Sequence, residues 1–165
     1  MTERNGTVVC PGSYDPVTNG HLDIISRTAR VFDRVVVGVV NNPVRKQSTL
    51  FSAEERVGFL ESQLSKLSNV QVKAFDTLLV HFARDNGASA IVKGLRAISD
   101  FEYEFEMNQL NRKLAPEIES MYIFASANYS FLSSTGVKEI ATFGGDVRDL
   151  VPDPVAKALA ERLAR

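Results

Sequence analysis

The sequence predicts an α/β domain in which a five-stranded parallel sheet is covered by helices on both faces. Short β-branched or apolar runs alternate with segments of helical period along the whole chain. Residues 35–40 are continuously apolar, which is typical of a strand buried on both faces. The length of 165 residues suits one domain, and no internal repeat or linker divides it.

The first half of the chain is expected to contain three strands and two helices. The strands are predicted at 7–10, 35–40 and 70–75. Apolar residues recur at helical spacing from Leu22 to Phe32, so a helix joins the first two strands. Ser52-Ala53-Glu54-Glu55 has the form of a capping box and predicts a second helix, with an apolar face that runs to Leu67.

The second half continues the alternation. Strands are predicted at 90–92 and 121–125, and helices at 78–86, 100–114, 134–143 and from Asp153-Pro154 as N-cap and first residue. Gly87 and Gly144-Gly145 end two of these helices. In the helix over 100–114 we expect Phe101 and Phe105, with Leu110 or Leu114, to face the core.

Composition excludes several classes of protein. The formal net charge is −1, so no basic surface argues for nucleic acid or an anionic membrane as partner. One cysteine excludes an internal disulfide, and two histidines with one cysteine do not form a zinc site from N and S ligands alone. No apolar run approaches a membrane span and residues 1–6 do not resemble a signal peptide, so we expect a cytoplasmic protein.

The most informative segment is Pro-Gly-Ser-Tyr-Asp-Pro-Val-Thr-Asn-Gly-His at 11–21, between a predicted strand and a predicted helix. A helix start offers N–H donors and a partial positive charge, both of which favour phosphate. Ser13, Thr18 and His21 add side-chain donors, and the glycines permit close approach of a ligand. A surface turn with an incidental histidine would explain Gly-His alone, but the full combination favours phosphate binding.

Three other predicted strands are also followed by groups suited to anions. Arg45 and Lys46 follow the second strand, Lys93-Gly94-Leu95-Arg96 follows the fourth, and Ser133-Ser134-Thr135 stands at a helix start after the fifth. The carboxyl ends of parallel strands meet at one edge of a sheet, where ligands bind. Solvated loop charges and a simple helix cap remain the alternative interpretations of the loop cations and the hydroxyl run.

The same residues also indicate the kind of chemistry. No Gly-x-Gly-x-x-Gly follows the first strand, and the phosphate-loop lysine motif is missing. No nucleophile with an assignable partner base is evident. A site rich in phosphate donors and poor in nucleophiles favours direct transfer between two bound phosphorylated ligands, by positioning and charge stabilisation.

The chain resembles the bacterial phosphopantetheine adenylyltransferases, a family of the nucleotidylyltransferase superfamily, over essentially its whole length. The likeness rests on residues 11–21, on Lys-Gly-Leu-Arg at 93–96, on Asp-Phe-Glu-Tyr-Glu at 100–104 and on Tyr-Ser-Phe-Leu-Ser-Ser-Thr at 129–135. It implies one Rossmann-like dinucleotide-binding domain over 1–165. It also implies transfer of the adenylyl group of ATP to 4′-phosphopantetheine, with dephospho-coenzyme A and pyrophosphate as products and no covalent enzyme intermediate.

The resemblance further implies roles for individual residues. The catalytic set is His21, Arg45, Lys93 and Arg96. The implied ATP contacts are Ser13, Tyr14, His21, Gly94, Leu95, Arg96, Glu104, Tyr129, Ser130, Phe131, Leu132, Ser133, Ser134 and Thr135. The implied contacts of the acceptor are Ser13, Arg45, Leu79 and Lys93. No protein metal site is implied, because Mg²⁺ would bind mainly through ATP phosphates. The family assembles as a hexamer.

This sequence departs from the family pattern at four of these positions, and at one of them Thr135 replaces the family's third serine. Ser13 stands where the family usually has threonine, which keeps the hydroxyl donor. Arg45 stands at the family's lysine that contacts the reacting phosphate, and the adjacent Lys46 is the alternative for that task. Lys93 stands where many relatives have arginine.

Two other functions stay open at this point. One is a nucleotidylyltransferase with another acceptor, such as nicotinate mononucleotide, which would share the first loop. The other is a non-catalytic adenine-nucleotide sensor on the same fold. Lys93 and the Arg45–Lys46 pair argue against a sensor, because a binding module needs no cations around an acceptor phosphate.

Overall fold

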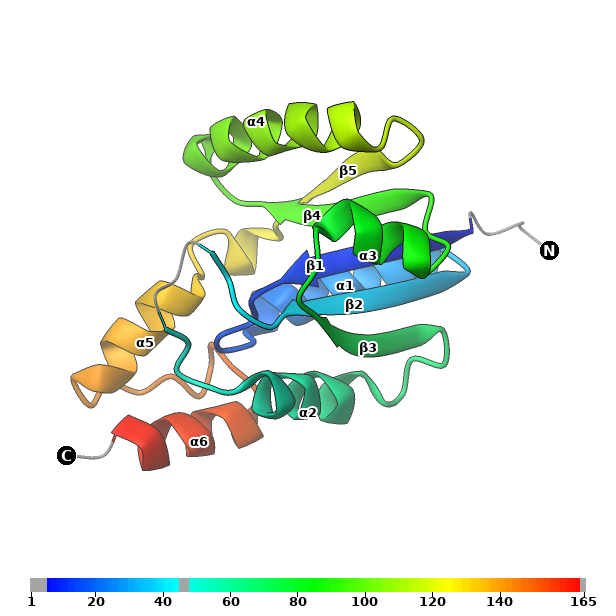
Figure 1. Ribbon diagram of the computed structural model, residues 1–165. Helices are drawn as coiled ribbons and strands as arrows, with labels where there is room; N and C mark the ends of the chain where they lie inside the picture. Colours follow the sequence, from blue (N-terminus) through cyan, green and yellow to red (C-terminus); the bar gives the residue numbers. More distant parts are fainter. Residues whose placement is uncertain (1–5, 45–47, 164–165) are drawn as a thin grey trace.

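A computed structural model describes residues 6–44 and 48–163 of the chain and confirms the predicted parallel sheet. Its strands are β1 (Thr7–Gly12), β2 (Arg34–Val40), β3 (Val70–Phe75), β4 (Ala90–Leu95) and β5 (Glu119–Phe124). They pair in parallel in the order β3-β2-β1-β4-β5 (Figure 1). The sheet therefore grows from β1 in one direction to β3, and the chain then crosses over to build the other half.

Helices cover both faces of this sheet, as predicted. They are α1 (Asn19–Val31), α2 (Ala53–Leu64), α3 (Leu79–Asp85), α4 (Ile98–Leu114), α5 (Ser134–Thr142) and α6 (Asp153–Leu163), with a short 3₁₀ turn at Ala127–Tyr129. In Figure 1 α3 lies in front of the sheet and α1 behind it.

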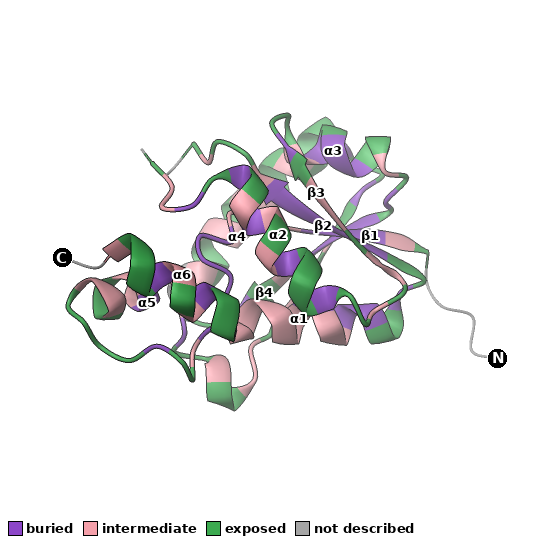
Figure 2. Ribbon diagram, turned by 90° about the horizontal axis from the view of Figure 1, so that it is seen from below, coloured by how far each residue is buried: buried purple, intermediate pink, exposed green. Residues whose placement is uncertain are grey.

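The alternation of strand side chains divides the core into two clusters. Val35, Val37 and Val39 face the cluster that includes buried residues of α1, α2, α5 and α6. Val36 faces the other cluster, which includes buried residues of α3. Figure 2 shows the buried stripes of α1, α2 and α6 turned inward. Burial on both faces explains why the 35–40 run contains no polar side chain.

Several element bounds differ from the sequence-based prediction. β1 continues through Gly12 and β4 through Leu95, because the neighbouring strands extend the ladder, so Lys93 and Gly94 lie in a strand rather than after one. α1 begins at Asn19, since Thr18 caps it. α2 ends at Leu64, so Leu67 lies beyond it although it still packs against the core. Asp153 is the first residue of α6 rather than its N-cap.

The predicted inward face of α4 is wrong. Phe101, Phe105, Leu110 and Leu114 are each at least 50% exposed. The helix instead turns Glu104 toward the sheet, where its carboxylate pairs with Lys93 and its carbonyl accepts from the Tyr122 hydroxyl. α4 therefore contacts β4 and β5 through polar groups, and these four apolar side chains lie on its exposed side.

Candidate active site

The predicted site residues gather where the strand order reverses. β1 and β4 are neighbours in the sheet, but β1 is followed in the chain by β2 on one side and β4 by β5 on the other. In open α/β sheets such a reversal leaves a crevice outside the carboxyl ends of the two strands. The loop over 13–18 leaves β1 there, and Arg96 directly follows β4 there.

His21 is held by the cap of α1. The Thr18 hydroxyl accepts from the His21 N–H at 3.4 Å, and the Thr18 N–H donates to His21 Nδ1 at 3.0 Å. This is a capping box with histidine in the place usually taken by glutamate or glutamine. Because Nδ1 accepts a hydrogen bond, the neutral ring carries its proton on Nε2. The imidazole thus presents Nε2 as a donor in a fixed orientation.

The amides at the start of α1 contribute less to phosphate binding than the sequence predicts. The Asn19 N–H donates to the Leu150 carbonyl at 2.9 Å, and the His21 N–H is used by the cap. Two of the amides in the first turn of α1 are therefore already used within the protein.

Tyr14 lies under this histidine rather than on the surface. Its ring meets the His21 ring edge to face, with centroids 4.9 Å apart, and its hydroxyl donates to the Cys10 carbonyl at 2.9 Å. The residue is buried, its φ is +50°, and the ring folds back over Gly12, where a Cβ would meet it at 3.0 Å. Burial raises the pKa of Tyr14 well above its ordinary value. These contacts give Tyr14 a part in packing the His21 ring.

The segment over 129–135 packs onto the first loop. The segment lies against Gly20, since a Cβ at that position would make ordinary van der Waals contacts, 3.5 Å from Tyr129 Cβ and 3.7 Å from Leu132 Cδ2. Ser134 Oγ donates to the Pro16 carbonyl at 2.7 Å, and Arg96 Nη1 donates to the Leu132 carbonyl at 2.7 Å. Three predicted segments from distant parts of the chain are thereby brought together.

Within that segment the side chains have different surroundings. Ser133 Oγ accepts from the Gly136 N–H at 3.0 Å and caps α5, while Leu132 is buried. Ser130, Phe131 and Thr135 are exposed. Two of the three hydroxyls at the start of α5 therefore already have structural partners.

Lys93 and Glu104 contact each other. Lys93 Nζ lies 2.9 Å from Glu104 Oε2, and both side chains are less than a quarter exposed. The family resemblance implies that Lys93 contacts the acceptor and that Glu104 contacts ATP, and the structure brings these two side chains together. A phosphate that approaches Lys93 enters beside a carboxylate that already partly neutralises the ammonium.

The contacts described above do not include three other predicted residues. Leu79 is the first residue of α3 and packs against the cluster on the other face of the sheet. Arg45 and Lys46 lie outside the described residues.

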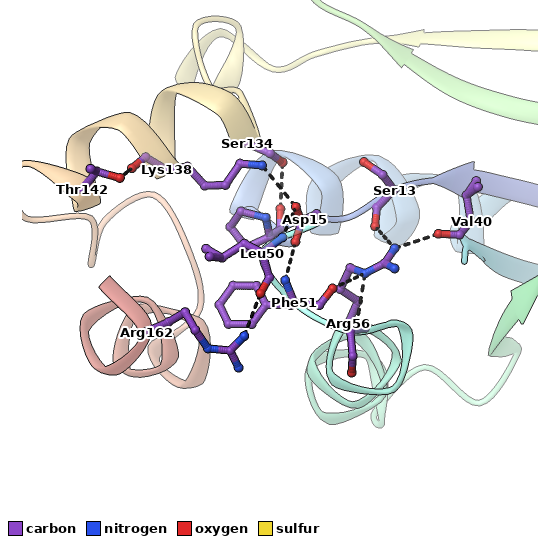
Figure 3. A network of polar contacts seen from close by, with 12 residues as sticks. Ser13, Asp15, Val40, Leu50, Phe51, Arg56, Ser134, Lys138, Thr142 and Arg162 are labelled. Atoms are coloured by element: carbon purple, nitrogen blue, oxygen red, sulfur yellow. Dashed lines mark hydrogen bonds and ion pairs between the residues drawn. The ribbon is translucent and has the colours of Figure 1, made fainter. Parts of the chain in front are cut away.

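Two buried charged residues beside the site were missed by sequence reasoning. Asp15 is fully buried and accepts from the N–H groups of Leu50 and Phe51, each at 2.9 Å, and from Lys138 Nζ at 3.1 Å (Figure 3). Burial alone would raise the pKa of Asp15, but these donors outweigh it and lower that pKa below its ordinary value.

The second missed residue is Arg56, which is 1% exposed in α2. A signal for it was present: Arg56 precedes Leu60 and Leu64 by four and eight residues, which places a cation on the apolar stripe of the helix. No comparable pattern marks Asp15, because its donors come from distant segments.

A hollow between α5 and α6 does not suit a phosphorylated ligand. Its volume is about 410 Å³, and the described residues that line it include Ala141, Val147 and Leu159 but no charged group. None of the predicted site residues is among them.

Among residues 6–44 and 48–163, no group of three or more His, Cys, Asp or Glu side chains could hold a metal ion. In the same ranges, no helix combines the length and the apolar character that a membrane span requires.

These features define a nucleotide-binding α/β domain, and comparisons with known proteins specify the class. Residues 9–140 match the family described as cytidylyltransferase-like. A solved structure of a protein from Vibrio parahaemolyticus, provisionally named a nicotinate-nucleotide adenylyltransferase, has the same fold with a TM-score of 0.70, at 14% identity over 97% of this chain and 96% of that one.

Curated relatives define the family more narrowly. Proteins named phosphopantetheine adenylyltransferase from Desulforudis audaxviator and Rubrobacter xylanophilus are each 53% identical to this chain, over 93% of both chains for the first and over 95% of this chain and 94% of the relative for the second. One from Alkaliphilus metalliredigens is 47% identical over 93% of this chain and 97% of the relative. The chain belongs to the phosphopantetheine adenylyltransferase family.

Proposed function

We propose that this protein transfers the adenylyl group of ATP to 4′-phosphopantetheine, giving dephospho-coenzyme A and pyrophosphate. The observation that carries the proposal is the fixed imidazole of His21 at the crevice between β1 and β4, beside the segment over 129–135. This arrangement occurs in a chain that is 53% identical to relatives named for that activity.

The mechanism that fits these residues is direct in-line transfer. An oxygen of the acceptor phosphate forms a bond to the α-phosphorus of ATP, and the bond from that phosphorus to the α,β-bridging oxygen breaks, so that this oxygen leaves with the β- and γ-phosphates as pyrophosphate. His21 Nε2 donates to an α-phosphate oxygen, where charge grows in the transition state. Lys93 attracts the acceptor phosphate, and Arg96 and the start of α5 hold the β- and γ-phosphates.

The contact between Lys93 and Glu104 also supports a defined position for each of the two ligands. The ion pair holds the ammonium near the boundary between the two subsites. A lysine acts on phosphate as a point charge and lacks the two-pronged geometry of arginine. Glu104 therefore restricts where Lys93 Nζ lies when the acceptor arrives.

Mg²⁺ is part of the proposal as an ion carried by ATP. The described residues offer no cluster of three ligands for a metal, and the one fully buried carboxylate, Asp15, already accepts three hydrogen bonds. The triphosphate oxygens suit Mg²⁺, which commonly keeps several waters and binds through substrate phosphates. Bound to ATP, the ion would neutralise part of the negative charge of the phosphates.

A homo-oligomer, a hexamer by the family resemblance, and a cytoplasmic location complete the proposal. The outward apolar side chains of α4 support an assembly, because half-exposed aromatic residues in one patch are typical of interaction surfaces. Phe101 and Phe105 stack within this patch with ring centroids 6.0 Å apart.

A single assay tests the reaction. The purified protein is incubated with ATP, Mg²⁺ and either 4′-phosphopantetheine or nicotinate mononucleotide, and pyrophosphate release is measured. We expect release only with 4′-phosphopantetheine. Release only with nicotinate mononucleotide would contradict the acceptor, and ATP binding without release under either condition would indicate a sensor.

A further inference from the structure

Arg56 is a buried cation that donates five hydrogen bonds to backbone carbonyls of the described residues. Nε donates to the carbonyls of Phe51 and Ser52 at 3.1 and 3.2 Å. Nη1 donates to the carbonyls of Ser13 and Val40, each at 2.8 Å, and Nη2 donates to that of Asn41 at 3.0 Å. Within the described residues no carboxylate forms an ion pair with this guanidinium.

Packing of α2 against the core does not require a charged side chain with this set of hydrogen bonds. Leu60 and Leu64 occupy the same stripe of α2 and are buried as apolar side chains. A buried cation without an ion-pair partner is expensive unless hydrogen bonds replace its water. Arg56 satisfies that condition only because three separate segments turn their carbonyls toward it, so the residue and these segments depend on one another.

The carbonyls lie where the β-sheet ladder ends. β1 and β2 are in register from Thr7 and Arg34 to the last pair, Gly12 and Val39. Ser13 follows Gly12 and Val40 follows Val39. The carbonyls of Ser13 and Val40 both accept a hydrogen bond from Nη1 of Arg56. The guanidinium of Arg56 therefore joins the two segments one residue beyond the last pair of β1 and β2 (Figure 3).

Asp15 holds the same loop from the other side. Its carboxylate accepts from the amides of Leu50 and Phe51, whereas the Phe51 carbonyl accepts from Arg56. The first loop is thus fixed to the segment before α2 by an anion and by a cation. Movement of the Ser13 backbone would require contacts of both charged groups to change.

We propose that Arg56 is a positioning residue for adenylyl transfer, acting through the backbone of Ser13 to hold the first loop against the end of β2. This inference rests on the proposed function for its kinetic consequence. Lysine cannot replace the side chain fully, because one ammonium cannot reach the acceptors of Nε, Nη1 and Nη2 together.

The kinetic test compares Arg56→Lys with the parent enzyme. At a temperature where circular dichroism shows both folded, we expect kcat to fall about tenfold to a hundredfold, because small misplacements of a substrate-holding group have effects of that size. We expect KM for ATP to change less than about threefold. Arg56→Met, which keeps much of the side-chain volume without the donors, should be at least as slow.

Asn69→Ala provides the matched control. The Asn69 side-chain amide also donates to two backbone carbonyls, those of Ala29 and Phe32. It lies just before β3, at the amino ends of the strands, whereas the site lies at their carboxyl ends. We expect this variant to lose stability and to keep kcat within about twofold of the parent, as expected for a loss of hydrogen bonds alone. A kcat for Arg56→Lys that is also within twofold of the parent would overturn the proposal.

A double variant tests whether Arg56 acts through Ser13. If it does, the loss of kcat in Arg56→Lys combined with Ser13→Ala is smaller than the product of the two single losses. Independent losses that multiply would mean that Arg56 affects activity through general stability, and would contradict the proposed route.

A measurement without substrate separates this proposal from the proposed function. Hydrogen exchange is followed by mass spectrometry for peptides that cover 12–18 and, as reference, 34–39. We expect faster exchange at 12–18 in Arg56→Lys and no change at 34–39. Unchanged exchange at 12–18 would overturn the positioning role even in an active enzyme. An inactive parent with accelerated exchange in the variant would overturn only the proposed reaction.

Discussion

At the scale of single residues, the His21 ring connects the cap of a helix to the chemistry. Thr18 uses its N–H to fix Nδ1, so the opposite nitrogen keeps one orientation. A fixed donor of this kind requires little reorganisation as charge grows on a phosphate oxygen. Helix capping and catalysis thus make use of the same side chain.

For His21→Ala we expect kcat to fall by about a hundredfold to a thousandfold, as for loss of a donor to a developing charge, while the Kd for ATP rises much less. The variant is studied by pyrophosphate release and by calorimetric ATP binding. His81→Ala is the matched control, since His81 is the other histidine of the chain and is exposed on α3. Equal losses in kcat and ATP affinity would contradict the transition-state role of His21.

Sequence reasoning selected segments that lie close together in the structure, but it did not predict the surroundings of their side chains. His21, Arg96 and the hydroxyl run were identified from motif and resemblance, and the structure brings these segments together. The burial of Tyr14 and the role of Asp15 were not predictable, because their partners depend on how loops pack. Arg56 left a detectable signal as a cation on an apolar stripe.

At the scale of elements, local patterns predicted the existence and order of every strand and α-helix. The capping box at Ser52 and Glu55 is confirmed, with both reciprocal hydrogen bonds present. The ends of β1 and β4 were missed because strand length is set by pairing with distant neighbours, which the local sequence does not record. The predicted orientation of α4 was wrong because the side of the helix that faces the sheet carries Glu104, and the apolar pattern by itself does not show whether an apolar side faces the core of its own chain.

Asp15 links three such elements, and its ionisation predicts how stability depends on pH. It joins the first loop to the segment before α2 and, through Lys138, to α5. Its pKa is lower in the folded protein than its ordinary value. A carboxyl group with a lowered folded pKa stabilises the protein above the ordinary value, about 4, and that stabilisation is lost as pH falls through the folded pKa.

For Asp15→Asn we therefore expect a loss of about 1–3 kcal/mol in the free energy of unfolding at pH 7, because an amide nitrogen would face a backbone donor. The difference from the parent should shrink as pH falls below about 4, where the Asp15 carboxyl group takes up a proton in the unfolded parent while it stays ionised in the folded parent. Urea unfolding at a series of pH values measures both quantities. Glu161→Gln is a suitable control, since Glu161 pairs with Lys157 on the exposed side of α6. A difference that is constant from pH 7 to pH 3 would exclude this role for Asp15.

At the scale of the whole molecule, the alternation of elements predicts a parallel sheet but not its strand order. The order β3-β2-β1-β4-β5 creates the crevice between β1 and β4, and only the crossover through α3 establishes it. The same topology leaves β5 at an edge with α4 beside it (Figure 1). Met121 and Phe124 of β5 are exposed together with the apolar residues of α4.

This exposed surface predicts self-association that depends on α4. In Phe101→Ser combined with Phe105→Ser, we expect the assembly to dissociate toward the 18.2 kDa chain without loss of secondary structure, because both rings are already more than half exposed in the single chain. Sedimentation velocity at several protein concentrations measures the change, and circular dichroism checks the fold. Phe143→Ser is the matched control, because Phe143 is 84% exposed at the end of α5 and away from α4. A parent protein that sediments as a single chain at every concentration, or a double variant that remains assembled, would show that the apolar side of α4 does not form the subunit contact.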